Sequence, residues 1–283
     1  MSLDVHSPRD RYIALIKDTL TFALWPQPPV PVSSLDPRLY GPAKRLAVQA
    51  VRKTSRSLEA KGFRIVKDLG ASEYDLEHGL VWPSYGDTMI GRRRMDNLQY
   101  CVETVLEQGV PGDLVETGVW RGGACIFMRA ILAAYEITDR TVYVADSFEG
   151  LPPPDPSYPA DEGDLHHERA QLEISLETVK ENFRRYDLLD NQVVFLKGWF
   201  SDTLPSAPMK EISVLRLDGD MYGSTMDGLN NLYPKLSKGG FLIVDDYNLP
   251  NCRAAIRDYR ETHNIDEEII DIDGSGVYWQ KIS

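Results

Sequence analysis

Acidic residues gather at two places where short apolar runs of the sequence end. Asp218-Gly219-Asp220 follows residues 212–217, and Asp245-Asp246 follows residues 241–244. If these runs are neighbouring parallel strands, the carboxylates lie roughly 5 Å apart at one edge of a sheet. Like charges so close either raise a pKa or bind a cation, and oxygen ligands without His or Cys favour Mg²⁺, Ca²⁺ or Mn²⁺. We predict a divalent metal site; the alternative is that Asp246 caps the next helix and Asp220 faces solvent.

A glycine-rich turn is the second candidate site, with the sequence Glu116-Thr117-Gly118-Val119-Trp120-Arg121-Gly122-Gly123. A strand that runs into such a turn and then into a helix brings backbone N–H groups close to a ligand. The spacing is GxxxGG, not the GxGxxG that fits a pyrophosphate, and the Glu116 carboxylate would repel phosphate. The turn favours an adenosine ligand with a cationic tail, although many such turns serve only tight packing.

Asp146 ends the next predicted strand, where a carboxylate is placed to accept both hydroxyls of a ribose. The alternative is an Asp that only caps the segment after it. A further segment runs from Leu151 through several prolines to His166-His167 and is too long and polar for a simple connection. It predicts a lid or substrate flap. His166 or His167 is a candidate base, although surface histidines on a loop are the commoner case.

The elements that position these residues alternate between strands and helices from residue 110 onward. Five nearly all-apolar runs predict a parallel sheet covered by helices on both faces. The strands are expected at residues 113–119, 141–146, 192–196, 212–217 and 241–244. The helices are expected at residues 124–135, 175–187, 225–236 (closing at Lys238-Gly239-Gly240) and 252–262. Residues 267–273 and 277–282 are separated by a gap of three residues, which permits only an antiparallel hairpin.

The N-terminal part lacks this alternation. It predicts helices at residues 11–24, 42–60 and 92–108, with a proline-rich spacer after the first. We divide the chain into an N-terminal helical cap or lid region, residues 1–109, and a sheet domain, residues 110–283. The helix at residues 42–60 is strongly basic, and a solvated face or a contact with an acidic subunit surface is the favoured interpretation.

The overall charge excludes several classes of partner. The chain has 31 Lys and Arg against 43 Asp and Glu, a net charge of −12, so phosphate-rich nucleic acid and anionic membranes repel it. Three widely spaced cysteines are typical of a reduced, cytoplasmic protein, and no apolar run approaches the ~18 residues of a spanning helix. The basic helix and the acidic remainder predict a homodimer or higher homo-oligomer.

Several long motifs resemble the macrocin O-methyltransferase (TylF-like) family. They lie at residues 11–17, 88–91, 112–123, 146–152, 197–200, 215–222 and 244–247, so the likeness covers nearly the whole chain. The resemblance implies an α/β class I methyltransferase with a Rossmann-like sheet, S-adenosylmethionine as cofactor and a divalent metal, usually Mg²⁺. It implies that the acceptors are sugar hydroxyls on antibiotics and related small-molecule glycosides.

The resemblance also assigns residues to roles. To the cofactor it assigns Glu116, Thr117, Gly118, Asp146 and Ser147, with Met89, Gly198 and Trp199 at its methionine and adenine ends. To the metal it assigns Asp218, Asp245 and Asp246, with Asp218 also proposed as the base. The acidic triad is similar to that of catechol O-methyltransferase, which has a lysine three residues after the first metal Asp. Here that position is Met221, so a carboxylate must take the proton.

These observations predict a metal-dependent sugar O-methyltransferase of antibiotic biosynthesis. A divalent cation lowers the pKa of a coordinated hydroxyl, which then attacks the methyl group in line. The alternatives are methylation of a non-sugar vicinal diol or catechol, and a non-catalytic module that binds S-adenosylmethionine. The missing GxGxxG and the terminal hairpin disfavour a nucleotide-dependent oxidoreductase.

Overall fold

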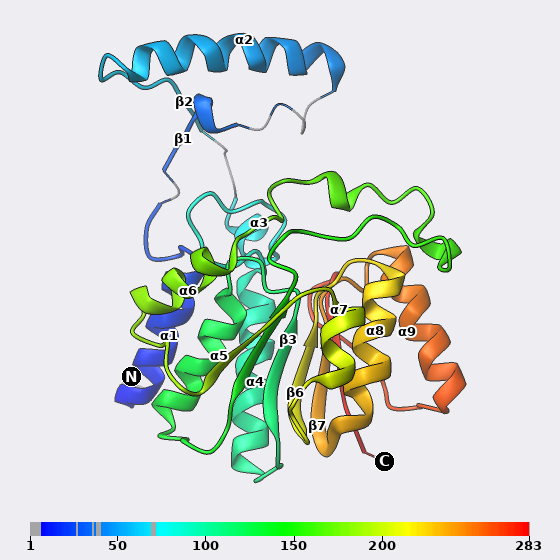
Figure 1. Cartoon of the computed structure of the whole chain (residues 1–283). Coiled ribbons are helices and arrows are strands. Elements are labelled where there is room, and N and C mark those ends of the chain that lie inside the picture. The colour runs from blue at the N-terminus through cyan, green and yellow to red at the C-terminus, as the bar shows by residue number, and fades with distance from the viewer. Residues whose placement is uncertain (1–6, 27, 36, 38–40, 69–71, 283) are drawn as a thin grey trace.

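A seven-stranded sheet forms the centre of the molecule. The computed structural model describes residues 7–26, 28–35, 37, 41–68 and 72–282 (Figure 1). The sheet has the order β5-β4-β3-β6-β7-β9-β8. Its strands are β3 (Asp113–Thr117), β4 (Val142–Asp146), β5 (Val193–Lys197), β6 (Ile212–Leu217), β7 (Leu236–Val244), β8 (Ile270–Asp271) and β9 (Val277–Gln280). Strands β3 to β7 are parallel, whereas β9 is antiparallel to both β7 and β8, which confirms the predicted hairpin.

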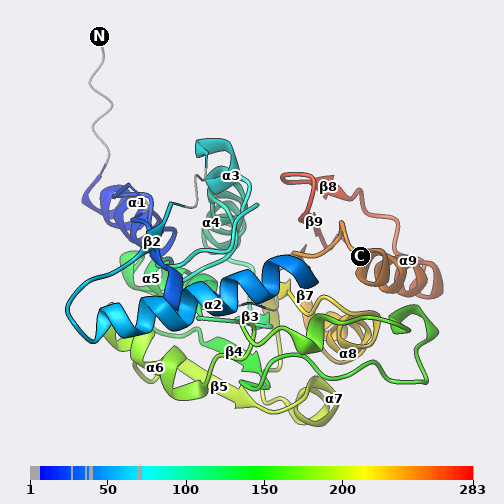
Figure 2. The ribbon, with the colours of Figure 1, turned by 90° about the horizontal axis from the view of Figure 1, so that it is seen from above.

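Helices cover both faces of the sheet (Figure 2). On one face lie α1 (Pro8–Leu20), α4 (Arg92–Glu107), α5 (Gly123–Ala134) and α6 (Leu176–Arg185). On the other face lie α7 (Phe200–Thr203), α8 (Tyr222–Leu232) and α9 (Pro250–His263). Because both faces are covered, all residues of β6 are buried, and Leu114 and Val115 of β3 enter opposite cores.

Two helices of the N-terminal region share a core with the sheet. Ile13 of α1 and Met95 of α4 are buried together with Leu114 of β3. By contrast, α2 (Pro42–Glu59) lies beyond the loops at one end of the sheet in Figure 1, with β1 (Val30–Pro31), η1 (Val32–Ser34) and β2 (Val66–Lys67) beside it. The short α3 (Glu73–Glu77) precedes α4. The division of the chain at residue 110 stays a prediction.

The helix expected at residues 225–236 is displaced toward the N-terminus. It is α8, which ends at Leu232 and passes into the 3₁₀ turn η6 (Tyr233–Lys235). Pro234 has no N–H to continue the hydrogen bonds of the helix. The predicted stop at Lys238-Gly239-Gly240 is wrong, because these residues lie inside β7, which is longer than expected at its start.

The long connection between β4 and α6 holds two 3₁₀ turns, η3 (Pro159–Asp161) and η4 (His166–Glu168). In Figure 1 this connection, in green, passes over α8 and α9. A third turn, η5 (Leu204–Ser206), follows α7. In the described ranges, none of the helices combines the length and the apolar character that crossing a membrane requires.

Candidate active site

A cavity of about 680 Å³ lies where the carboxyl ends of the parallel strands meet. The segments that follow β3 to β7 all contribute to its wall, as does the long connection after β4. The residues predicted from the sequence that line it are Met89, Gly118, Asp146, Ser147, Gly198, Trp199, Asp218, Asp245 and Asp246. Glu116 and Thr117 are buried in β3 and lie outside this lining. A volume of this size suits a small-molecule cofactor or substrate.

The glycine-rich turn after β3 approaches β6 closely. Gly118 has φ +83°, and a Cβ at this position would lie 1.6 Å from the carbonyl oxygen of Asp218. The Asp218 N–H donates to the carbonyl oxygen of Thr117 at 2.9 Å. Only glycine permits this approach, so the turn both packs tightly and exposes its backbone to the cavity.

Asp146 fixes the same turn from the end of β4. Its Oδ2 accepts a hydrogen bond from the Val119 N–H at 2.7 Å, and its Oδ1 accepts from the Phe148 N–H at 2.6 Å. Burial raises the pKa of Asp146, and these backbone N–H bonds oppose that shift. The structure thus contains the capping role that the sequence left as an alternative. Each carboxylate oxygen has a second lone pair, and Asp146 still faces the cavity.

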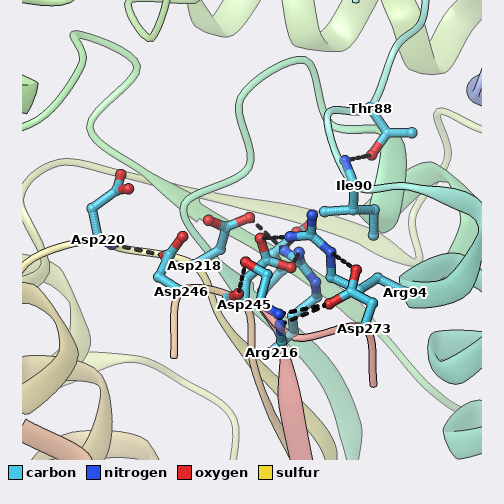
Figure 3. A network of polar contacts seen from close by, with 12 residues as sticks. Thr88, Ile90, Arg94, Arg216, Asp218, Asp220, Asp245, Asp246 and Asp273 are labelled. Carbon is cyan, nitrogen blue, oxygen red and sulfur yellow. Dashed lines mark hydrogen bonds and ion pairs between the residues drawn. The ribbon is translucent and has the colours of Figure 1, made fainter. Parts of the chain in front are cut away.

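Three carboxylates that line the cavity converge. Figure 3 shows them side by side. Oxygens of Asp218, Asp245 and Asp246 lie within 4.8 Å of one another. Asp220 lies next to them with φ +58°, and its N–H donates to Asp246 Oδ2 at 3.0 Å. Asp246 does not cap α9, whose N-cap is Leu249, and Asp220 lines the cavity. The alternative in which Asp246 caps the next helix is therefore wrong, whereas Asp220 is half-buried at the cavity.

A buried ion network holds the carboxylates in place. The Arg216 guanidinium on β6 contacts Glu116, Asp218 and Asp245. The Arg94 guanidinium on α4 contacts the other carboxylate oxygen of Asp245 and also contacts Asp273. Figure 3 shows the two arginines flanking Asp245.

Neither arginine was identified as a site residue from the sequence. A signal for Arg216 was available, because it is the single charged residue in the apolar run of residues 212–217. A guanidinium buried in a central strand needs carboxylate partners, since the desolvation of an unpaired charge is too costly. Arg94 carries no such signal, because it is one of three consecutive arginines at the start of α4, and the other two, Arg92 and Arg93, are exposed.

The charges around the cluster do not balance. Two guanidinium groups face six carboxylates, a formal surplus of four negative charges, and these carboxylates are Glu116, Asp218, Asp220, Asp245, Asp246 and Asp273. Burial and the neighbouring Asp245 raise the pKa of Asp218 to about 8, against the pull of Arg216. Burial, followed by Asp220 and Asp218, raises the pKa of Asp246 well above its usual range. An all-oxygen donor set with such a surplus fits a divalent cation.

Further lining residues come from the connection after β4 and from the glycine-rich turn. His166 lines the cavity, with its Nδ1 at 2.9 Å from Asp164 Oδ1, whereas His167 lies outside the lining. Trp120 was not predicted as a site residue, yet it lines the cavity at φ +47° and donates its indole N–H to the Gln171 carbonyl oxygen at 2.8 Å. Tyr158 also lines the cavity.

Comparison with known proteins agrees with this geometry. Residues 9–281 match the macrocin O-methyltransferase (TylF) family. The chain belongs to this family. The predicted resemblance is thereby confirmed, and the protein is a methyltransferase. Methyltransferases of this family use S-adenosylmethionine as the methyl donor.

Individual relatives of this macrocin O-methyltransferase family member cover most of its length. It is 56% identical over 209 residues to mycinamicin III 3''-O-methyltransferase of Micromonospora griseorubida, and the match covers 72% of this chain and 82% of that protein. It is 55% identical over 208 residues to demethyldecarbamoylnovobiocin O-methyltransferase of Streptomyces niveus, covering 72% and 79%.

Solved structures confirm the class I methyltransferase fold. The structure of the O-methyltransferase NovP superimposes with a TM-score of 0.80 at 42% sequence identity, over 97% of this chain and 100% of that chain. The calicheamicin methyltransferase CalS11 gives a TM-score of 0.54 at 21% identity, over 68% and 81%, and is similar in fold.

Proposed function

We propose that this enzyme transfers the methyl group of S-adenosylmethionine to a hydroxyl of a sugar on a glycosylated natural product, in antibiotic biosynthesis. Two relatives support this by their names, which specify mycinamicin III and demethyldecarbamoylnovobiocin. A third, from Streptomyces olivaceus and 58% identical over 204 residues, is named for the 4' position of a rhamnosyl tetracenomycin C. The observation that carries the proposal is the carboxylate triad at the cavity of a chain with this ancestry.

The cofactor is proposed to lie against the turns that follow β3, β4 and β5. Asp146 and Ser147 would hold the ribose, Gly118 would bring its backbone to the methionine part, and Met89, Gly198 and Trp199 would flank the ends. Glu116 and Thr117 would act only indirectly. Glu116 pairs with Arg216, and Thr117 bonds to the Asp218 N–H, so both residues fix the turn without facing the cavity.

The metal is proposed to be Mg²⁺ or another divalent cation, held by Asp218, Asp245 and Asp246. Its two positive charges would halve the surplus negative charge of the network. A cation bound there lowers the pKa of a coordinated acceptor hydroxyl. Arg94 and Arg216 keep Asp245 oriented toward the other two ligands, because each guanidinium contacts one of its carboxylate oxygens.

For the general base, the geometry favours a different residue from the one that the sequence suggested. Asp218 was expected to be both ligand and base, but it accepts from Arg216 at 2.7 Å and belongs to the ligand triad. A cation and a guanidinium both favour the ionised form of a carboxylate and weaken it as a base. Asp220 lines the cavity two residues further on and lies outside the Arg216 contacts. We therefore propose Asp218 as a ligand and Asp220 as the group that takes the hydroxyl proton.

A methylation assay across a panel of glycosides tests the proposal, with product detected as a mass gain of one methylene. EDTA should abolish turnover and Mg²⁺ should restore it, while calorimetry should show that S-adenosylhomocysteine still binds. Asp220→Asn should lose about 10²–10⁴-fold in kcat, as expected for a lost general base. It should keep the rise in Tm that Mg²⁺ causes in the wild-type protein, whereas Asp218→Asn should lose that rise. Asp202→Asn, an exposed charge on α7, is the matched control.

Several outcomes would contradict these assignments. Full-speed methylation by metal-free enzyme would contradict the proposed metal dependence. Full activity of Asp220→Asn would return the base role to Asp218. Turnover of a catechol or a non-sugar diol, with no glycoside accepted, would replace the sugar acceptor. Cofactor binding without any turnover would favour a non-catalytic module.

We also propose a homo-oligomer. The basic helix α2 exposes Leu46 at 70% and Val51 at 43%, while the chain as a whole carries a net charge of −12. An apolar and basic helix complements an acidic surface of a second copy. Light scattering at micromolar concentration should give a dimeric or larger mass, and a monomeric mass that salt does not change would contradict this.

The proposed setting is the cytoplasm, with a small-molecule glycoside and no nucleic acid as partner. Cys101, Cys125 and Cys252 are all buried as free thiols, which suits a reducing compartment.

A further inference from the structure

Asp161 is a buried carboxylate on the connection between β4 and α6. It is 1% exposed, although it lies on a long polar loop. Its Oδ1 accepts from the Tyr222 N–H at 2.7 Å, and its Oδ2 accepts from the Gly223 N–H at 2.9 Å. The Asn251 side chain on α9 donates to Oδ1 at 3.2 Å. Both oxygens therefore accept hydrogen bonds, from α8 and from α9.

These bonds supply a cap that α8 lacks. The residue at the N-cap of α8 is Met221, which makes no side-chain capping bond. The first N–H groups of a helix have no partner within the helix, and the positive end of the helix dipole favours a negative charge there. Asp161, separated from Tyr222 by 61 positions in the chain, provides both the acceptors and the charge. This distant cap explains why α8 begins earlier than its own sequence predicts.

The surface of α8 is shaped to receive the loop. A Cβ at Gly223 would lie 2.8 Å from the ring of Tyr158, so only glycine lets the loop come this near. The rings of Tyr158 and Tyr222 pack with their centroids 5.6 Å apart. A second carboxylate of the loop, Asp164, accepts from the Asn251 side chain at 3.1 Å. The loop thus docks through two acidic residues and one aromatic ring.

The docked loop fixes the segment that carries the catalytic carboxylates. Residues 218–221 join β6 to α8. They are held at the start by the Arg216 contact with Asp218 and at the end by the Asp161 contacts with Tyr222 and Gly223. Between these two points Asp220 has φ +58°, a conformation that an L-residue keeps only when its surroundings impose it. The Asp220 N–H also donates to Asp246 Oδ2 at 3.0 Å. Losing the second anchor would leave that single bond to hold Asp220 in its strained conformation beside the triad.

We propose that Asp161 is a positioning residue that couples docking of the loop at residues 151–174 to the placement of Asp220. The same loop lines the cavity with residues 151–156 and with Tyr158, Asp161, His166, Arg169 and Leu172. Enclosure of the acceptor and placement of the base are therefore one event. The role of Asp220 in this inference rests on the proposed function, whereas the contact between Asp161 and α8 does not.

The test is Asp161→Asn compared with Glu162→Gln. Asparagine keeps the shape but has one acceptor oxygen, and its amide N–H₂ would face a backbone N–H. Glu162 is the next residue, is exposed, and loses the same charge in its variant. We expect kcat of Asp161→Asn to fall by about 10–100-fold through misplacement of the base, with the affinity for S-adenosylhomocysteine unchanged. Hydrogen exchange should become faster at residues 221–226 and at the start of α9, and Glu162→Gln should match the wild type.

Three results would overturn the proposal. Equal hydrogen exchange of residues 221–226 in Asp161→Asn and wild type would show that Asp161 does not hold the start of α8. Faster exchange with an unchanged kcat would show that this contact does not position the base. Exchange that rises throughout the chain would mark a general loss of stability and would also count against it. If wild-type enzyme methylates no glycoside, the proposed function fails, yet the exchange measurement still decides the contact between Asp161 and α8.

Discussion

Replacing Arg216 by leucine tests how strongly the buried ion network contributes to stability. The guanidinium is 1% exposed and contacts three carboxylates, so leucine removes a cation from a site that water does not reach. Asp245 would keep its contact with Arg94, and Asp218 is partly open to the cavity. Glu116 is 2% exposed and would keep only the Cys125 thiol, at 2.8 Å from its Oε2. The variant therefore leaves one fully uncompensated buried charge.

The expected loss follows from that single charge. Breaking a buried ion pair by removing one partner costs about 3–5 kcal/mol, because the remaining ion has lost its water and its counter-charge. For a chain of this size each kcal/mol lowers Tm by about 2 °C, so Arg216→Leu should lower Tm by about 6–10 °C. Adding Glu116→Gln to Arg216→Leu should recover part of this loss, since it neutralises the orphaned carboxylate.

Thermal unfolding followed by circular dichroism at neutral pH, without divalent metal, is the assay. Arg253→Leu is the control, because Arg253 is exposed and stacks on Tyr247 outside the network. If Arg216→Leu unfolds at the temperature of this control, the network does not stabilise the fold as argued. If Glu116→Gln recovers nothing in the Arg216→Leu background, the loss does not come from the unpaired Glu116 charge.

Two further predictions concern the cofactor and the pH. Asp146→Ala should weaken S-adenosylmethionine binding by roughly 2–3 kcal/mol through the loss of charged hydrogen bonds, and calorimetry that shows an unchanged affinity would remove the ribose assignment. The raised pKa values of Asp218 and Asp246 mean that the folded metal-free protein binds protons more tightly than the unfolded chain. Its free energy of unfolding should therefore fall as the pH rises from about 4, the unfolded value, toward about 8, the pKa of Asp218. Mg²⁺ should raise Tm more at the upper end of this range, and a Tm of the metal-free protein that stays constant across it would contradict the argument.

Local patterns of the sequence determine most of the sheet. The apolar runs mark the five parallel strands because a strand covered on both faces has no polar side, and the three-residue gap between the runs 267–273 and 277–282 leaves only a hairpin. The acids that follow β6 and β7 converge because these strands are neighbours and end at the same edge. Here chain order and strand periodicity suffice, since each feature depends on residues close together in sequence.

Features that depend on partners far apart in the chain were decided by the tertiary structure. The register pairs Glu116 of β3 with Arg216 of β6, so the Glu116 carboxylate is a buried counter-ion of that guanidinium, a role that the sequence did not predict. The start of α8 depends on Asp161, because an N-cap supplied from another segment leaves no mark in the sequence of the helix itself. Periodicity tells which face of an element is buried, but it does not tell which charge on a neighbouring element meets that face. Strand register and loop docking determine which charges meet, because a buried charge is stable only where an opposite charge contacts it.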